Sequence, residues 1–180
     1  MPHYKRVEGD KVYLSPISTD DIDTFMNWVN DPEIIRFTGH YIKIISLLNE
    51  KEAIEKIAKE GNYFSIVAQE DNKLLGICNF FRIDEINRSA EIGIMIGEKD
   101  NLGKGYGSEA LNLLLKFGFE SRNYNNISLR VMSFNERAIA CYEKVGFKRQ
   151  GLYREAIIRG NKKYDMIYMD ILADEYFDKS

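Results

Sequence analysis

The sequence predicts an α/β protein of the α+β kind, with a central mixed, mostly antiparallel, twisted sheet of about seven strands and about four helices. Three observations predict this class. Strand-like apolar runs gather in residues 62–97 and return after residue 152. Apolar residues recur at helical spacing before residue 61 and again within residues 106–146. Between residues 97 and 146 helix-like and strand-like runs alternate.

Composition predicts a single domain over residues 1–180. The chain has 180 residues, of which 44% are hydrophobic, and a formal net charge of −3. A chain of this length buries roughly 70% of its unfolded surface on folding, and no repeat or linker-like tract divides it. The sequence pI of about 5.5 argues against a nucleic-acid coat or a polybasic membrane anchor, because both need surplus positive charge. We therefore expect no nucleic-acid partner and no membrane partner.

Cysteine and histidine usage predicts a reduced, metal-free protein. Cys78 and Cys141 form no C-x-x-C pair, so we expect both thiols to be reduced and buried. Of the two histidines, neither His3 nor His40 has a partner at metal-site spacing. No run approaches the roughly 20 apolar residues of a membrane helix, and the first residues lack a signal-peptide core. A cytoplasmic location is expected.

The first third of the chain is predicted to hold one strand and two helices. A strand over residues 12–16 is followed by a helix that begins after Ser18 and ends at Pro32. A second helix covers residues 46–61, with a serine as N-cap and a glycine where a left-handed residue closes the helix. Residues 31–45 show no clear pattern.

The next segment is predicted to be an antiparallel meander of three strands, over residues 62–69, 73–83 and 89–97. In the third strand isoleucines alternate with other residues. The period of two therefore places Glu91 on the face opposite the isoleucines.

The second half is predicted to alternate between helices and strands and to finish as a hairpin with its turn at Gly160-Asn161. The expected elements are helices near residues 106–118 and 135–146, a strand over 127–131, and hairpin strands over 152–158 and 163–172.

The glycine-rich loop over residues 102–110, LGKGYGSEA, lies between a predicted strand and a predicted helix. Glycines allow a tight turn with inward N–H groups, and a helix N-terminus adds positive charge, so the loop is a candidate anion cradle. It is not a P-loop, because no Lys-Ser/Thr pair follows the glycines. Its glycine interval also differs from the dinucleotide fingerprint, and it follows an antiparallel meander. A turn that binds nothing is the alternative.

A second motif, NERAIACYEKVGF, follows at residues 135–147. Together with the glycine loop it resembles the GNAT superfamily of acetyl-CoA-dependent N-acetyltransferases, and within it the subgroup of ribosomal-protein N-terminal and spermidine acetyltransferases. The similarity extends over nearly the whole chain, from residues 12–14 to residues 151–155. The resemblance implies the GNAT fold, in which the sheet splays between its fourth and fifth strands, here residues 89–97 and 127–131.

The resemblance further implies that acetyl-CoA is the cosubstrate, and it assigns the residues that bind it. The backbone at the end of the fourth strand pairs with the pantetheine amides, and the glycine loop holds the pyrophosphate. The implied contacts are Met95, Ile96, Gly97, Leu102, Gly103, Lys104, Gly105, Tyr106, Gly107, Ser108, Asn135, Ala138 and Tyr142. The family usually has Arg or Gln where Leu102 stands, so one contact to the pyrophosphate is either missing or supplied by Lys104.

Three residues are predicted to be catalytic. By resemblance, Tyr142 is the general acid and Asn135 lies near the thioester. Helical spacing places both on one face with Ala138, and Asn135 can also cap its helix. A primary amine with a pKa near 10 must lose a proton before it attacks. Glu91 is the candidate base, acting through a water. Packing for Tyr142 and solvation for Glu91 are the structural alternatives.

The predicted reaction transfers an acetyl group from acetyl-CoA to a primary amine, by direct attack in a ternary complex. The amine is that of a protein N-terminus or of a small molecule such as a polyamine. Residues 19–33 carry five acidic side chains and no Lys or Arg, which suits a cationic acceptor, although acids also complement a helix dipole. Two alternatives stay open: a catalytically inactive acetyl-CoA-binding regulatory module, and transfer to a hydroxyl or hydrazine nitrogen. The protein is expected to be a monomer or a homodimer.

Overall fold

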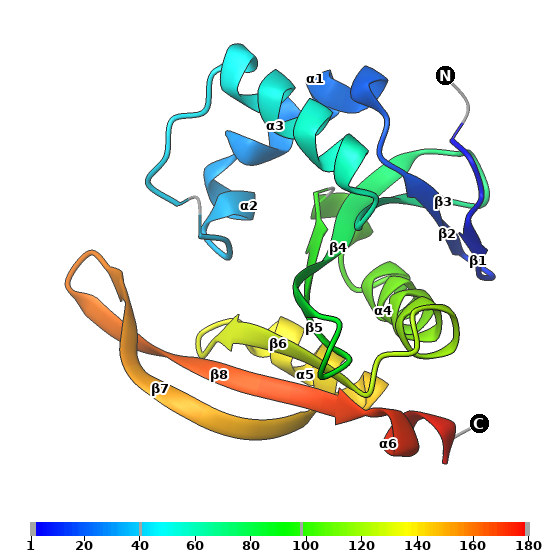
Figure 1. The fold of residues 1–180 in the computed structure, drawn as a ribbon. Coiled ribbons are helices and arrows are strands. Elements are labelled where there is room, and N and C mark those ends of the chain that lie inside the picture. The colour runs from blue at the N-terminus through cyan, green and yellow to red at the C-terminus, as the bar shows by residue number, and fades with distance from the viewer. Residues whose placement is uncertain (1–2, 40, 98, 179–180) are drawn as a thin grey trace. The chain divides into compact units, whose positions relative to one another are not determined.

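The computed structural model describes residues 3–39, 41–97 and 99–178, and within them the chain forms eight strands and six α-helices (Figure 1). The chain divides into two compact units. Residues 1–79 and 94–114 form the first, and residues 80–93 and 115–180 form the second. Strands β4 (Leu74–Asp84) and β5 (Ser89–Ile96) run from one unit into the other. One domain over residues 1–180 stays a prediction.

The first unit holds the N-terminal strands, three helices and the start of a fourth. These elements are β1 (Val7–Glu8), β2 (Val12–Pro16), α1 (Ile22–Val29), α2 (Pro32–Ile35), α3 (Leu47–Glu60), β3 (Tyr63–Ala68) and α4 (Tyr106–Lys116). The predicted caps of α3 are confirmed: Ser46 Oγ accepts the N–H of Asn49 at 3.2 Å, and Gly61 has φ +69°. Ser18 caps the 3-10 turn before α1. Pro32 does not end α1 as predicted, because α1 stops at Val29 and Pro32 opens α2.

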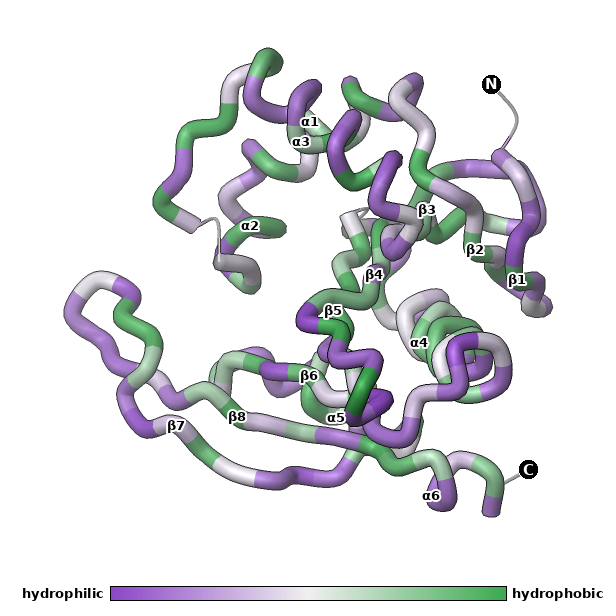
Figure 2. Tube along the Cα trace, viewed as in Figure 1, coloured by the Kyte–Doolittle hydropathy of each residue, from purple (hydrophilic) through white to green (hydrophobic). Residues whose placement is uncertain are grey.

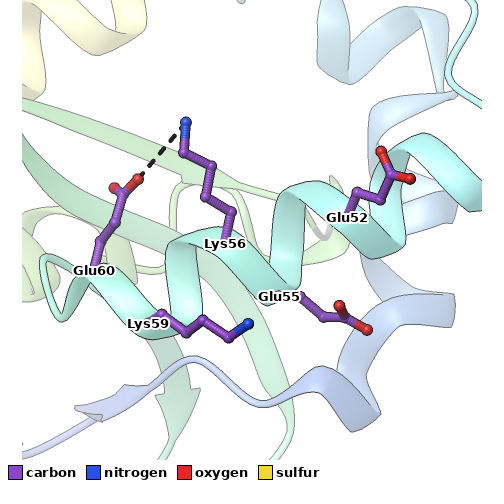
Figure 3. A pocket seen from close by; sticks show the side chains of 5 residues that line it. All are labelled: Glu52, Glu55, Lys56, Lys59 and Glu60. Carbon is purple, nitrogen blue, oxygen red and sulfur yellow. Dashed lines mark ion pairs between the residues drawn. The ribbon is translucent and has the colours of Figure 1, made fainter.

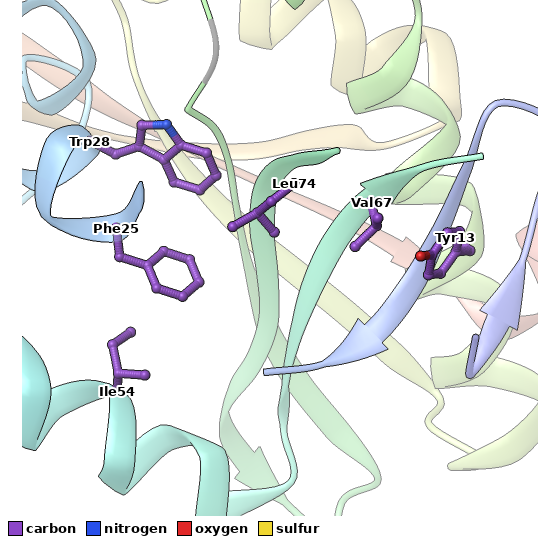
Figure 4. Packing of buried hydrophobic residues seen from close by; sticks show 6 residues of the cluster. All are labelled: Tyr13, Phe25, Trp28, Ile54, Val67 and Leu74. Carbon is purple, nitrogen blue, oxygen red and sulfur yellow. The ribbon is translucent and has the colours of Figure 1, made fainter. Parts of the chain in front are cut away.

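Apolar side chains from α1, α3 and the strands build the core of the first unit. Phe25 and Trp28 meet edge to face with ring centroids 5.6 Å apart. Figure 4 shows both rings, with Ile54 of α3, facing the strands that carry Tyr13, Val67 and Leu74. The periodic apolar positions of the predicted helices and strands therefore share one core.

The second unit holds the remaining elements. They are a π-helical turn at Phe117–Ser121, β6 (Asn126–Met132), α5 (Glu136–Val145), β7 (Lys148–Arg159), β8 (Lys162–Leu172) and α6 (Ala173–Phe177). Phe80 packs against Tyr124, with ring centroids 5.5 Å apart. A Cβ added at Gly118 would lie 2.6 Å from Ile127 Cδ1, so the packing there needs glycine.

Strand pairing confirms the predicted mixed, mostly antiparallel sheet. The bonded order is β1-β2-β3-β4-β5-β6-β8-β7. β5 and β6 pair in parallel from Ser89 with Asn126 to Glu91 with Ser128, whereas β6 continues antiparallel to β8 as far as Met132. The parallel ladder is thus short, as the predicted splay requires. β7 and β8 form the predicted hairpin, a long curved ribbon in Figure 1.

Three short elements go beyond the prediction. β1, α2 and α6 contain two, four and five residues, which is too short for a periodic pattern to show. The strand count is therefore eight and not about seven. The long elements follow hydropathy closely, and Figure 2 shows apolar residues gathered along α4.

Candidate functional site

The glycine loop turns from β5 into α4 through two residues with left-handed backbone. Gly103 has φ +79° and Gly105 has φ +89°, a conformation that glycine adopts without strain. Gly107 differs, because it lies within α4 and an added Cβ would meet Ile96 Cγ1 at an ordinary 3.7 Å. The loop therefore requires two of its three glycines for its backbone path.

Backbone donors gather where α4 begins. The N–H of Glu109 donates to the carbonyl of Gly105 at 3.1 Å, so the N–H groups of Tyr106, Gly107 and Ser108 precede the first helical hydrogen bond. Among the residues that the structure describes, none of these three groups has a protein acceptor. Ser108 Oγ donates to the same Gly105 carbonyl at 2.9 Å. With the positive end of the helix dipole, this geometry suits an anion.

The end of β5 presents one backbone unit to its open edge. The N–H of Gly97 donates to the carbonyl of Leu75 in β4 at 2.9 Å. Successive residues of a strand direct their N–H and C=O groups to opposite edges, so those of Ile96 face away from β4. A Cβ at Gly97 would lie 2.0 Å from Trp28 Cδ2. Of the predicted pantetheine contacts, the backbone of Ile96 is thus placed to form hydrogen bonds with an extended ligand. Gly97 allows the Trp28 ring to pack directly against the backbone.

In the second unit, Asn135, Ala138 and Tyr142 lie at the start and along one side of α5. Asn135 Oδ1 accepts the N–H of Ala138 at 3.3 Å, which confirms that Asn135 caps the helix. The Tyr142 ring meets Phe147 edge to face, with centroids 6.0 Å apart. Burial, and secondarily the neighbouring Cys141, raises the pKa of the Tyr142 hydroxyl. The phenol therefore stays protonated at neutral pH, as a proton donor must.

Glu91 carries two ion pairs. Its Oε1 accepts from Arg130 Nε at 2.6 Å, and its Oε2 accepts from Arg82 Nη1 at 3.0 Å. The Glu91 side chain is only 11% exposed, against 28% for Arg130 and 60% for Arg82. It is therefore not a solvated carboxylate. Each carboxylate oxygen has two lone pairs, so each keeps a second acceptor site beside its guanidinium bond, and a proton taken up there would weaken both ion pairs.

The predicted site residues form two groups. The contacts from Met95 to Ser108 lie in the first unit, and Glu91, Asn135, Ala138 and Tyr142 lie in the second. Each group has the geometry described above. Their joining into one site stays a prediction.

Comparison with known proteins decides the family. Residues 11–148 match the family model described as the acetyltransferase (GNAT) domain. The chain belongs to the GNAT acetyltransferase family. Over 171 residues, 93% of this chain and 96% of its relative, the acetyltransferase is 29% identical to the uncharacterized N-acetyltransferase p20 of Bacillus licheniformis. Over 115 residues, 64% of this chain and 66% of the relative, it is 30% identical to spermidine N(1)-acetyltransferase of Vibrio cholerae. The predicted family and enzyme class, an acetyl-CoA-dependent acyltransferase, are confirmed.

Solved structures confirm the predicted fold of the acetyltransferase. A GNAT-family acetyltransferase from Bacillus anthracis superposes with a TM-score of 0.83 at 21% identity. Spermidine N-acetyltransferase from Vibrio cholerae, in complex with CoA and spermine, superposes with a TM-score of 0.82 at 24% identity. Each comparison covers 94% of this chain and 99% of the other. At these identities the likeness concerns the fold.

Motif reasoning missed several charged residues beside the predicted ones. Lys11 Nζ donates to the carbonyl of Lys104 at 3.1 Å, and Glu109 Oε1 accepts the N–H of Lys11 at 2.7 Å. Lys11 and Glu109 stand 98 residues apart in sequence, so no local spacing could reveal the contact. Arg82 and Arg130, whose guanidinium groups pair with Glu91, were missed for the same reason.

The histidines and cysteines do not form a metal group in the described part of the chain. His3 Nε2 lies 2.9 Å from Asp21 Oδ2, and His40 is outside the described residues. No cluster of three or more His, Cys, Asp or Glu side chains there is arranged to hold a metal ion. Burial raises the pKa of the Cys78 thiol, and Cys141 is half-buried.

Among the helices of the described residues, none has the length and apolar composition of a membrane span. A cytoplasmic location stays a prediction.

A shallow depression on the exposed side of α3 is lined by charged residues alone: Glu52, Glu55, Lys56, Lys59 and Glu60 (Figure 3). Lys56 Nζ lies 4.0 Å from Glu60 Oε1. Pairs at this spacing give weak support to an exposed helix. The depression is open to solvent and no apolar or aromatic residue lines it, so we assign it to the solvated face of α3.

Proposed function

We propose that this acetyltransferase transfers the acetyl group of acetyl-CoA to a primary amine, by direct attack in a ternary complex. One observation carries the proposal. In a chain that matches the GNAT family over residues 11–148, three N–H groups at the start of α4 follow two left-handed glycines and have no acceptor among the described residues. Two relatives, spermidine N(1)-acetyltransferase and the putative ribosomal N-acetyltransferase YdaF of Bacillus subtilis, have names that point to amine acceptors.

The residues of the first unit fit acetyl-CoA. The N–H groups from Tyr106 to Ser108 would hold the pyrophosphate, because phosphate oxygens accept hydrogen bonds at a helix N-terminus. The backbone of Ile96 would pair with a pantetheine amide in the manner of an added strand. When bound, acetyl-CoA supplies the thioester whose carbonyl carbon the amine attacks.

Proton transfer defines the roles of the second unit. Starting from an ammonium, the acceptor nitrogen loses one proton before attack and a second as the N–C bond forms and the C–S bond breaks, while the sulfur gains one. We assign the proton for sulfur to the Tyr142 hydroxyl, which burial keeps protonated. Asn135, which caps the same helix, is assigned a contact near the thioester.

The proton that the amine loses before it attacks is assigned to Glu91, acting through a water, and the second proton leaves the nitrogen to water. Arg82 is the more exposed of its two partners, at 60%. Because an exposed ion pair contributes little free energy, the Arg82 guanidinium is the one that can exchange for water at Oε2. Arg130 then keeps Oε1 in place from a distance of 2.6 Å. Direct loss of the proton to solvent is the competing route.

The acceptor is proposed to be a polyamine or a protein N-terminus. Two of the five acidic side chains near α1 and α2 have structural roles that need no ligand. Asp31 Oδ1 accepts the N–H of Glu33 at 2.8 Å, and Asp21 pairs with His3. These carboxylates therefore do not choose between the two acceptor classes, and the assay has to include both.

Thiol release from acetyl-CoA tests the proposal. The acceptor panel is spermidine, a peptide with a free N-terminus and an aminoglycoside, with the N-acetylated form of the same peptide as the blocked control. Release with one free amine, and an acetylated product in mass spectrometry, is expected. CoA binding without transfer to any acceptor would indicate a regulatory module. No binding of CoA at all would refute the assignment of the glycine loop.

A further inference from the structure

We propose that Lys11 binds the pyrophosphate of the acetyl donor, with Glu109 positioning it. This inference rests on the proposed use of acetyl-CoA and adds a side-chain ligand from the N-terminal hairpin to the backbone donors of the glycine loop. All the residues concerned belong to the first unit.

The ammonium of Lys11 lies at the left-handed turn of the glycine loop. Its Nζ donates to the carbonyl of Lys104 at 3.1 Å. A Cβ added at Gly105 would lie 3.5 Å from the same nitrogen. An ammonium group has three donors, and the bond to Lys104 uses one. Among the described residues the Lys104 carbonyl is its one acceptor, so two donors remain beside Gly105, directly before the N–H groups of α4.

A tight turn between β1 and β2 sets the course of the chain at Lys11. The N–H of Gly9 donates to the carbonyl of Val12 at 2.9 Å. Gln69 binds both sides of the turn: its Nε2 donates to the carbonyl of Gly9, and its N–H donates to the carbonyl of Lys11, each at 2.9 Å. The backbone of this turn is therefore fixed on β3, although the Lys11 side chain is exposed.

Glu109 attaches the same turn to α4. Its Oε1 accepts the N–H of Lys11 at 2.7 Å and the N–H of Val12 at 3.3 Å. A Cβ at Gly9 would lie only 2.5 Å from this oxygen, so the approach requires glycine. Glu109 lies in the first turn of α4, where a carboxylate is also favoured by the helix dipole. The carboxylate thus links the hairpin to the helix that provides the phosphate donors.

Lys11 is also placed to supply the charge that Leu102 lacks. Leucine offers no charge to a pyrophosphate, and the nearby Lys104 directs its Nζ to Asn101 Oδ1 at 3.3 Å. The Lys11 ammonium instead binds a loop carbonyl at the turn itself. We therefore assign the side-chain charge at this site to Lys11.

Calorimetric titration with CoA and with dephospho-CoA tests the assignment. Lys11→Met keeps the length of the side chain and removes its charge, and Lys11→Arg restores the charge. Lys51→Met, at an exposed position of α3, makes the same charge change elsewhere. We expect Lys11→Met to weaken the binding of both ligands about tenfold, the size of a charge-assisted hydrogen bond. The loss should shrink at high salt, Lys11→Arg should recover most of it, and Lys51→Met should bind as wild type does.

The outcomes separate this inference from the proposed function. If wild type binds CoA and Lys11→Met binds it equally well, Lys11 is not a ligand and the proposed function stands. A loss for CoA but not for dephospho-CoA would place Lys11 at the 3′-phosphate and overturn the pyrophosphate assignment. A larger loss in Lys104→Met than in Lys11→Met would transfer the role to Lys104. No binding by wild type would refute the proposed function itself.

Discussion

Glu91 Oε1 lies 2.6 Å from Arg130 Nε at the point where β5 and β6 stop pairing. Glu91 pairs with Ser128 in the last step of the ladder, and Arg130 follows two residues later on the same face of β6. Arg82 adds its guanidinium from β4 with φ +48°, a backbone that costs about 1 kcal/mol for a residue other than glycine. The carboxylate thus connects three neighbouring strands, and any catalytic role must operate within these contacts.

Glu91→Gln should lose most activity near neutral pH and recover part of it at high pH. Glutamine keeps an acceptor oxygen and nearly the same shape, but it cannot take up the proton of the amine. Above pH 9 an increasing fraction of a polyamine nitrogen with a pKa near 10 is already neutral, and a protein N-terminus with a pKa near 8 is mostly neutral, so the need for a base falls. The measurement is kcat/KM for the best acceptor from pH 6 to pH 10.

Arg82→Met provides the matched control for Glu91. It breaks the more exposed ion pair and keeps the carboxylate, so its activity should exceed that of Glu91→Gln at neutral pH. Urea unfolding of both variants separates lost stability from lost chemistry. A Glu91→Gln profile that overlays the wild-type profile would show that the proton leaves to solvent and that Glu91 serves the strands alone.

Tyr142→Phe should lower kcat by about 10² to 10⁴, the usual contribution of a general acid, and leave acetyl-CoA affinity within about twofold. Burial raises the pKa of Tyr142, so the folded protein keeps this phenol protonated at pH values where a free tyrosine ionises. The activity ratio of wild type to variant should therefore be constant from pH 7 to about 9.5. Steady-state and single-turnover rates at several pH values measure it.

The control for Tyr142 is the same change at Tyr124, a buried tyrosine of the second unit. The Tyr124 hydroxyl is buried and has no hydrogen-bond partner in the described part of the chain, so Tyr124→Phe should leave kcat unchanged. A Tyr142→Phe rate within about twofold of wild type, measured where chemistry limits turnover, would reduce Tyr142 to a packing partner of Phe147.

Gly105→Glu should raise the Kd for acetyl-CoA at least about 100-fold. The new side chain would place a negative charge beside the pyrophosphate donors, and like charges at close range repel by several kcal/mol where solvent is excluded. Gly61→Glu is the matched control, because Gly61 also has positive φ, at +69°, with open space around it. Both changes introduce similar backbone strain, but only the first should abolish binding in calorimetry. Equal affinity in the two variants would show that the loop is only a turn.

Hydropathy predicted the long elements, because in these the apolar residues recur at regular spacing over enough residues for the pattern to show. The helix α3 shows this well, because Ser46 and Gly61 mark both ends with residues that local geometry requires. The α5 motif was found through resemblance, since spacing alone gives Asn135 a cap and Tyr142 a face but no chemistry. The helix α2 was not predicted, because its four residues are too few to show a helical repeat of apolar side chains.

Contacts between segments that lie far apart in the chain could not be predicted from the sequence. The period of two in β5 placed Glu91 on a face, but it could not show that two arginines occupy that face. The contact between Glu109 and the turn at Lys11 depends on how β1 and β2 pack on α4, which no local pattern encodes. Leu102 is visibly uncharged in the sequence, whereas the position of the Lys11 ammonium beside the carbonyl of Lys104 is known only from the structure.

Glu109 is predicted to act on acetyl-CoA through Lys11. Glu109→Ala removes the acceptor for the N–H groups of Lys11 and Val12, so the turn should leave the loop and the Kd for CoA should rise about as much as in Lys11→Met. Glu109→Gln keeps a carbonyl oxygen at this place and removes a negative charge near the phosphate. Its affinity should therefore equal or exceed that of wild type.

The double variant Lys11→Met with Glu109→Ala decides whether Glu109 works through Lys11. If it does, the second change adds almost nothing to the first, because the lysine that Glu109 positions is already gone, and the coupling free energy should approach the whole single-variant loss. Independent roles would instead give losses that multiply in Kd. Thermal unfolding of all four proteins shows whether Glu109→Ala also weakens α4, because loss of stability moves Tm in both Lys11 backgrounds alike. A purely structural Glu109 would change Tm and leave the CoA affinity of the folded protein unaltered.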